Sequence, residues 1–239
     1  MRRIVVTGVV LLIAGCGGGS NKTTSAPVKT TPSGNGGTVN AVGTKGLLVP
    51  ALTILDGKTS VVGKVTPISP KENRPTDAQQ HGVAGGAACA SASSDPGPAN
   101  LNAMSAAILC LLNAERTSRG LAGLHSNGAL RRASQGMANT MVKQRFFAHV
   151  TPGGKDVIDR IRPTGYVHGR WSLGENIAWG SGALATPRAI MNGWMHSPGH
   201  RANILRGQFK DIGIGIRLGA PGRGLSGGAT YVTDFGRHS

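Results

Sequence analysis

The sequence has 239 residues and a formal net charge of +16 at pH 7. All nine Phe, Trp and Tyr residues follow residue 145, which excludes an aromatic core in the first hundred residues and predicts one C-terminal domain. Residues 101–239 alone hold 17 Lys and Arg against 6 Asp and Glu, so the excess charge is not confined to a tail. A basic surface favours an anionic partner such as lipid head groups, cell-wall polymers or nucleic acid. The basic residues are scattered and form no nucleic-acid motif, so nucleic acid is disfavoured, and a merely solvated basic surface is the alternative.

The first 16 residues read MRRIVVTGVVLLIAGC and predict an export signal. Arg2 and Arg3 form a positive start, and the apolar run from Ile4 to Ala14 is too short to span a bilayer comfortably. The Ile-Ala-Gly-Cys ending resembles the lipobox of bacterial lipoproteins, which implies cleavage before Cys16 and attachment of lipid to its sulfur. An ordinary signal peptide with a chance cysteine is the alternative. We expect an exported protein that is lipid-anchored at the membrane surface of the cell envelope, on the extracellular or the periplasmic side.

Residues 17–98 are predicted to be a low-complexity linker. Gly, Ser, Thr, Asn and Pro dominate residues 17–43, which indicates a flexible tether. Residues 47–65 differ, because two short apolar runs flank Asp56-Gly57, and this pattern signals a hairpin. A lone hairpin is marginal in water, so this one either packs on the main domain or stays loose.

Two cysteines remain once Cys16 is assigned to lipid, and an even pair in an exported protein favours a disulfide. Cys110 lies beside the apolar stripe of the first predicted helix of the domain, so its thiol can reach outward to Cys89. This bridge would pin the end of the linker to the domain and stabilise it by roughly 3 kcal/mol. Two unpaired thiols are the alternative.

The main domain is expected over residues 99–239 and begins with helices. A helix is predicted over residues 101–119, with Asn100 as its candidate N-cap. On its less apolar side, three polar residues are expected to tie the helix to neighbouring loops by charge-assisted hydrogen bonds; they are Asn113, Glu115 and Arg116.

Three further helices are predicted from apolar residues at helical spacing. The second follows the candidate cap Asn127, the third is short and ends at Pro163, and the fourth opens at Thr186-Pro187. Residues 165–178, between the third and fourth helices, are expected to form a loop.

Two strands are predicted near the C-terminus, over residues 211–216 and 229–235, with a Gly-rich turn between them. Gly213 and Gly215 on the first of these indicate close approach of another backbone. Helices that come first and paired strands that come last indicate an α+β sandwich and not a βαβ fold.

The segment Trp194–Leu205, which reads WMHSPGHRANIL, predicts the end of one helix, a sharp turn and the start of another. Ser197 is a good N-cap, and Pro198 suits the first helical position. His200 then lies near the positive end of the new helix, which disfavours its charged form and suits it to act as a neutral ligand or acceptor. Asn203 is expected to fix the backbone of this corner.

Seven segments occur in the order seen in bacterial members of the CAP superfamily, whose relatives include cysteine-rich secretory proteins, antigen 5 and plant pathogenesis-related proteins. They are LLNAERTSRGL, FFAHVTPGG, RIRPTGY, GENIAWG, WMHSPGHRANIL, FKDIGIGI and YVTDFG. The resemblance covers about residues 101–236. It implies an α-β-α sandwich with an antiparallel sheet in the middle layer.

The cleft of this family commonly presents two His and two acidic residues, and the resemblance assigns three of them. His149 matches the His of the FxH segment, Glu175 matches the Glu of the GEN segment, which also contains Asn176, and His200 matches the His of the GH corner. The family often has a second Glu where this chain has Ser197, so the tetrad is incomplete. His196 and Asp234 match no position of the motifs, although either side chain could approach the cleft.

Chemically, His149, His200 and one carboxylate could hold a divalent metal such as zinc, or perform general acid–base catalysis. A purely structural role is the alternative, in which Glu175 holds its loop with His149 as its partner. The HExxH helix of a zinc protease and the G-x-S-x-G turn of a serine hydrolase are both absent from the sequence. The preferred hypothesis is a surface-tethered binding module that holds an anionic envelope lipid, polymer or protein in or beside this cleft. The alternative is a divalent-metal-dependent hydrolase of peptide or cell-wall substrates that uses the same residues.

Overall fold

The computed structural model describes residues 47–55, 58–68 and 89–239. The predicted signal, the predicted lipidation site Cys16, the predicted tether and the Asp56-Gly57 turn lie outside the described residues. Within the described ranges, no helix combines the length and the apolar character that crossing a membrane requires.

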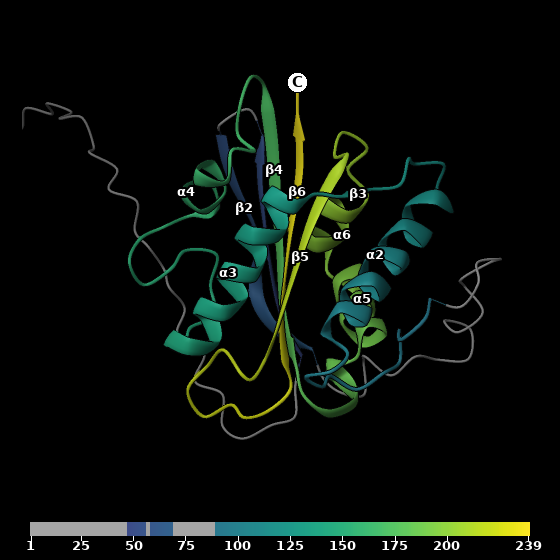
Figure 1. Cartoon of the computed structure of the whole chain (residues 1–239), viewed down its shortest axis with the longest axis vertical. Coiled ribbons are helices and arrows are strands. Elements are labelled where there is room, and N and C mark those ends of the chain that lie inside the picture. The colour runs from purple at the N-terminus through teal and green to yellow at the C-terminus, as the bar shows by residue number, and fades with distance from the viewer. Residues whose placement is uncertain (1–46, 56–57, 69–88) are drawn as a thin grey trace, which may run out of the picture. The chain divides into compact units, whose positions relative to one another are not determined.

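A six-stranded sheet forms the middle layer, in the strand order β2-β1-β4-β6-β5-β3 (Figure 1). Its strands are β1 (Leu47–Leu55), β2 (Lys58–Ile68), β3 (His125–Ser126), β4 (Trp171–Gly180), β5 (Asp211–Leu218) and β6 (Ala229–His238). Neighbouring strands are antiparallel, except that the two-residue β3 pairs with β5 in parallel.

Helices cover both faces of the sheet, so the predicted α-β-α sandwich is confirmed. Figure 1 shows α3 and α4 on one side of the sheet and α2, α5 and α6 on the other. The helices are α2 (Leu101–Thr117), α3 (Gly128–Gln144), α4 (Val157–Ile161), α5 (Pro187–His196) and α6 (Pro198–Ile204), with short 3-10 turns η1 (Arg162–Thr164) and η2 (Gly182–Ala185). The largest cluster of buried side chains lies on the α2, α5 and α6 side and includes Met104, Ile108, Trp194, Phe209 and Ile212.

Helix starts follow local chemistry. The Asn127 side chain accepts hydrogen bonds from the first N–H groups of α3, which confirms the predicted cap. The Thr186 hydroxyl accepts one from α5, and this helix opens at Thr186-Pro187 as predicted. Asn100 occupies the N-cap position of α2 without capping it. Its side chain instead accepts a bond from the Gly97 N–H and donates one to the Asp95 carbonyl, so it fixes the preceding turn.

Helix α3 approaches strand β5 closely, as its two glycines predicted. A Cβ atom at Gly213 would lie 2.1 Å from the carbonyl carbon of Leu130, and one at Gly215 would lie 2.4 Å from the backbone of Ser134. Neither distance is compatible with a side chain, so glycine sets the separation of helix and sheet.

The predicted loop over residues 165–178 is wrong in its second half, because residues 171–180 form strand β4. This strand lies between β1 and β6 and is buried on both faces, so it shows no alternation of polar and apolar residues. Its Gly-Glu-Asn sequence also has the composition of a turn. Tertiary contacts therefore overrode the local pattern.

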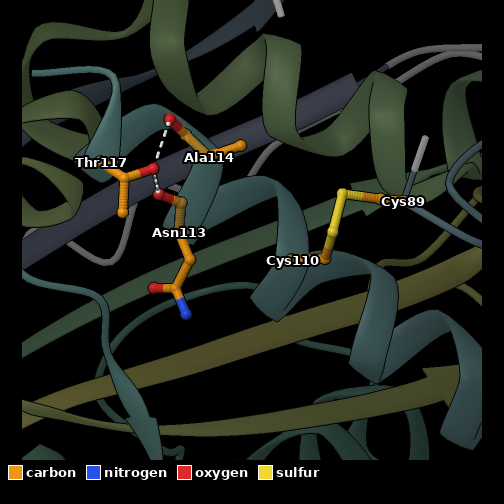
Figure 2. Close-up of a disulfide and its surroundings, with 5 residues drawn as sticks. All are labelled: Cys89, Cys110, Asn113, Ala114 and Thr117. Atoms are coloured by element: carbon orange, nitrogen blue, oxygen red, sulfur yellow. Dashed lines mark hydrogen bonds between the residues drawn. A yellow bond between two sulfur atoms is a disulfide. The ribbon is translucent and has the colours of Figure 1, made fainter. Parts of the chain in front are cut away.

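Strands β1 and β2 form an antiparallel pair, as the hairpin signal predicted, and β1 also pairs with β4. The end of the predicted linker is attached to the helices. A disulfide joins Cys89 to Cys110 on α2, with a Cα–Cα distance of 5.8 Å, which confirms the predicted bridge (Figure 2). Three residues later, the Ala92 carbonyl accepts a hydrogen bond of 2.8 Å from the Arg188 N–H at the start of α5.

Arg116 is the main polar tie between α2 and the loop after α6. It is fully buried and donates to the carbonyls of Ala122, Ile204, Arg206 and Phe209. Asn113 bonds both backbone groups of Leu124, so the expected ties are confirmed for these two residues. Glu115 forms an ion pair with Arg119 in the turn directly after α2, so its tie reaches only the next turn of the chain.

Candidate functional site

Strand β4 carries the Gly-Glu-Asn segment and sends its side chains to opposite layers. Successive side chains of a strand alternate between the two faces of a sheet. Glu175 faces the layer of α3 and α4, where it contacts Arg160. Asn176 faces α6 and donates a hydrogen bond of 3.2 Å to the His200 carbonyl. A Cβ atom at Gly174 would lie 3.0 Å from the Phe209 ring, so glycine allows the loop after α6 to pack here.

The Glu175 carboxylate is fully buried and engaged at both oxygens. His149, in the loop after α3, places Nδ1 2.7 Å from Oε1, and Arg160 of α4 donates from Nη2 to Oε2. Arg160 also donates from Nη1 to the His149 carbonyl at 2.8 Å, which joins the three residues in one cluster. A capping box of Asp156 and Asp159 fixes the start of α4 and so positions Arg160.

The pKa values of two neighbouring carboxyl groups, those of Glu175 and Asp234, shift in opposite directions. Burial alone would raise the pKa of Glu175, but Arg160 and His149 outweigh it and lower that pKa below its usual value. Asp234 lies opposite Glu175 in the register of β4 and β6. Burial, and then the charge of Glu175, raises the pKa of Asp234 well above its usual range.

One hydrogen bond acts against the raised pKa of Asp234. The Ser134 hydroxyl of α3 donates to Oδ2 of Asp234 at 2.8 Å and also lies 2.9 Å from the Leu130 carbonyl. A donor to the carboxylate lowers the pKa of Asp234, but burial and the charge of Glu175 outweigh this bond. Both carboxyl groups are fully buried, which keeps substrates away from them. Asp234 matches no motif position, and the sequence indicated only that it could approach the cleft; its register opposite Glu175 places it there.

His200 belongs to a different polar cluster, on the other face of the sheet. Its Nδ1 lies 2.7 Å from the Ser197 hydroxyl. Ser197 is the N-cap residue of α6, but its side chain makes no cap bond, so the predicted capping role of its hydroxyl is wrong. The Asn203 amide donates to the Asn176 side-chain carbonyl at 2.9 Å, which ties the corner to β4.

The structure therefore brings His149 together with Glu175, and His200 together with Ser197 and Asn176, but it does not unite the two groups. The sheet lies between the Glu175 carboxylate and helix α6, because Glu175 and Asn176 point to opposite faces. The Nδ1 atom of His196 bonds the Asn192 carbonyl on the surface of α5.

These residues do not fit a divalent metal such as zinc. Both oxygens of Glu175 and one ring nitrogen of His149 already bind protein partners. Among the residues that the structure describes, no three His, Cys, Asp or Glu side chains are placed to hold a metal ion together.

His149 is more exposed than its partner Glu175. Its side chain is 10% exposed, whereas that of Glu175 is 0% exposed. Its Nε2 atom makes no hydrogen bond within the described ranges, although it is buried, and such an atom costs about 1–3 kcal/mol when it has no partner. On the other face, a depression of about 350 Å³ lies at the α5–α6 corner and is lined by Met195, His196 and Arg201 among others.

Comparison with known proteins agrees with the motifs. The model of the CAP family, described as the cysteine-rich secretory protein family, matches residues 109–234, which is more than half of the chain. An uncharacterized protein of Bacillus subtilis (strain 168), YkwD, is 32% identical over 118 residues, which cover 49% of this chain and 44% of that protein. An uncharacterized membrane protein of the same strain, YlbC, is 30% identical over 109 residues, which cover 46% of this chain and 30% of that protein. The chain thus spans less than half the length of these relatives.

Two solved structures are also similar. One is an extracellular protein containing an SCP domain from Bacillus anthracis, with 24% identity and a TM-score of 0.45, covering 59% of this chain and 44% of that one. The other is an outer surface protein from Borrelia burgdorferi, with 17% identity and a TM-score of 0.45, covering 55% of this chain and 90% of that one.

Proposed function

We propose that this chain, which belongs to the CAP, or cysteine-rich secretory protein, family, is an exported, lipid-tethered binding module for an anionic component of the cell envelope. The lipoprotein-type signal over residues 1–16 supports export and tethering. The Cys89–Cys110 disulfide supports an oxidising compartment outside the cytoplasm. The net charge of +16 supports an anionic ligand, either a lipid head group or a wall polymer.

One observation favours binding over catalysis: Glu175, the acidic residue of the family motif, is buried and uses both carboxylate oxygens in contacts within the protein. Glu175 has no exposed side-chain surface, and its two oxygens bind Arg160 and His149. A general base or a metal ligand needs a lone pair that can reach the reacting group. Glu175 has neither access nor a vacant oxygen, so the metal-dependent hydrolase is the weaker proposal.

We place the ligand beside His149, on the side of the sheet that carries α3 and α4. This imidazole is held by Glu175 on one nitrogen, while its second nitrogen has no protein partner in the described structure. Because Nδ1–H donates to the Glu175 carboxylate, the neutral imidazole presents Nε2 as an acceptor. A hydroxyl of an anionic lipid head group or wall polymer that donated there would satisfy a polar atom that is costly to leave unpaired. The binding site thus keeps two of the three predicted cleft residues and omits His200.

The test is co-sedimentation of the full chain with phosphatidylglycerol vesicles, with phosphatidylcholine vesicles and with purified cell-wall polymer, at low and high salt. We expect binding to an anionic probe that weakens with salt and falls at least fivefold in His149→Gln. His125→Gln is the matched control, because His125 is an exposed histidine on β3 with no role in the cluster. The absence of binding to every anionic probe, even at low salt, would refute the proposal.

The hydrolase alternative is tested on the same preparations. Stoichiometric zinc in the purified chain, lost in His149→Gln and accompanied by cleavage of wall polymer or peptide, would favour it over binding. We expect neither the metal nor the cleavage.

A further inference from the structure

The outer edge of strand β5 is largely open. Strand β3 is the last strand of the described sheet and pairs with β5 only at Asp211 and Ile212. From Ile214 onward, no described strand lies beside this edge. An open edge presents backbone N–H and C=O groups that can pair with an added extended chain.

The hydrogen bonds along this edge show which backbone groups face outward. The Ile212 carbonyl accepts a bond of 2.9 Å from the Asn127 N–H. The Gln135 carboxamide accepts from the Ile216 N–H at 3.2 Å and donates to the Ile216 carbonyl at 3.0 Å. In an antiparallel ladder, alternate residues direct both groups to the same side. Ile214, midway between them, therefore directs its N–H and C=O to this edge, where none of the hydrogen bonds found among the described residues engages them.

The Gln135 contact shows what kind of group this edge can bind. Its carboxamide makes the pair of hydrogen bonds to Ile216 that a peptide group of an added strand would make. The space beside the edge therefore accommodates an amide group, and Gln135 also limits any added pairing to a short stretch around Ile214.

The space beside Ile214 is a groove of about 200 Å³ between the N-terminal halves of α2 and α3. Leu101 and Ser105 of α2 form one wall, and Arg131 and Gln135 of α3 form the other. Arg217 of β5 completes it, and none of its described lining residues is a carboxylate. Arg131 and Arg217 are both exposed, and neither takes part in an ion pair within the described structure.

We propose that this groove binds a short acidic peptide segment in extended conformation, which pairs with the Ile214 N–H and C=O and places carboxylates on Arg131 and Arg217. Backbone pairing supplies the register, as in other complexes in which a strand is added to a sheet edge. Side chains two residues apart on an extended peptide point to the same side, so a Glu-x-Glu pattern offers two carboxylates to the two guanidinium groups. The groove lies at the β5 edge of the sheet, where β6 separates β5 from β4, and it does not depend on the proposed function at His149.

The test is an NMR titration of the full chain, labelled with ¹⁵N, with the blocked tripeptide acetyl-Glu-Val-Glu-amide. We expect a saturable shift of the Ile214 amide signal. Acetyl-Gln-Val-Gln-amide should bind at least tenfold more weakly, and so should the Glu peptide to the Arg131→Gln/Arg217→Gln variant. The matched control is Arg132→Gln/Arg223→Gln, which removes the same charge from exposed arginines outside the groove and should leave the affinity unchanged.

Three outcomes would overturn the proposal. The first is an Ile214 amide that does not shift. The second is an equal loss of affinity in the two double variants, which would mean diffuse charge attraction. The third is an equal shift with inorganic phosphate alone, which would mean a general anion site without strand pairing.

Discussion

Removing the Arg160 cation is the most direct test of the buried cluster. The Arg160 side chain is 8% exposed and Glu175 is 0% exposed, so Arg160→Met leaves a carboxylate buried without its main compensating charge. Breaking a buried pair in this way costs about 3–5 kcal/mol. For a domain of this size, that loss lowers the melting temperature by roughly 10 °C. The control is Arg162→Met in η1, an exposed neighbour whose loss should change stability by no more than about 0.5 kcal/mol.

The pH dependence of this difference gives a second readout. In the wild type, the lowered pKa of Glu175 contributes stability that is present above its unfolded-state value and lost as the pH falls through the folded-state value. Without Arg160, burial dominates and raises the folded-state pKa of Glu175. The variant therefore loses stability as the pH rises above the unfolded-state value. The stability gap between wild type and Arg160→Met should accordingly shrink as the pH falls from 7 toward 4 in urea unfolding experiments.

A double variant tests whether the unpaired charge of Glu175 causes this loss of stability. Glu175→Gln removes the stranded charge, so Arg160→Met/Glu175→Gln should be more stable at pH 7 than Arg160→Met alone. If the second substitution adds a further full loss of stability, or if Arg162→Met is as damaging as Arg160→Met, then the ion pair does not hold this cluster together.

Three further changes test the close packing of α3 on β5, the Cys89–Cys110 disulfide and the protonated state of Asp234. Gly213→Ala should destabilise the protein by at least about 1–3 kcal/mol, because the added Cβ overlaps the α3 backbone. Gly136→Ala, in the open part of α3, should stabilise it by up to about 1 kcal/mol. Thermal unfolding of both variants tests this, and equal effects would contradict the close approach of α3 to β5. Cys89→Ala/Cys110→Ala should lose about 3 kcal/mol, measured by urea unfolding against wild type with and without reductant, and reductant should leave the variant unchanged. Asp234→Asn should be more stable than wild type at pH 7. The raised pKa of Asp234 makes the wild type lose stability as the pH rises from the unfolded-state pKa toward the folded-state pKa. The difference in stability between the two proteins should therefore disappear near pH 4, and a difference that widens there would argue for an ionised Asp234.

Local chemistry explains which elements could be predicted. Asn127, Thr186 and Pro187 define helix starts through bonds to the first N–H groups or through a fixed backbone angle, and these depend only on near neighbours. The pairing of Cys89 with Cys110 needed only the export signal and the side of the helix that Cys110 occupies. Strand β4 could not be predicted in this way, because a strand buried on both faces shows no periodicity of two.

The sequence by itself determined the family, the sandwich of helices and strands, the disulfide and the pairing of His149 with Glu175, since each follows from motif order or from short-range chemistry. Only the tertiary structure decided which side of the sheet each candidate residue faces. Glu175 and Asn176 are neighbours in the chain, yet the alternation of a central strand sends one to Arg160 and the other to the His200 corner. The same long-range pairing of β4 with β6 placed Asp234 beside Glu175, a contact between residues far apart in the sequence that no local pattern encodes.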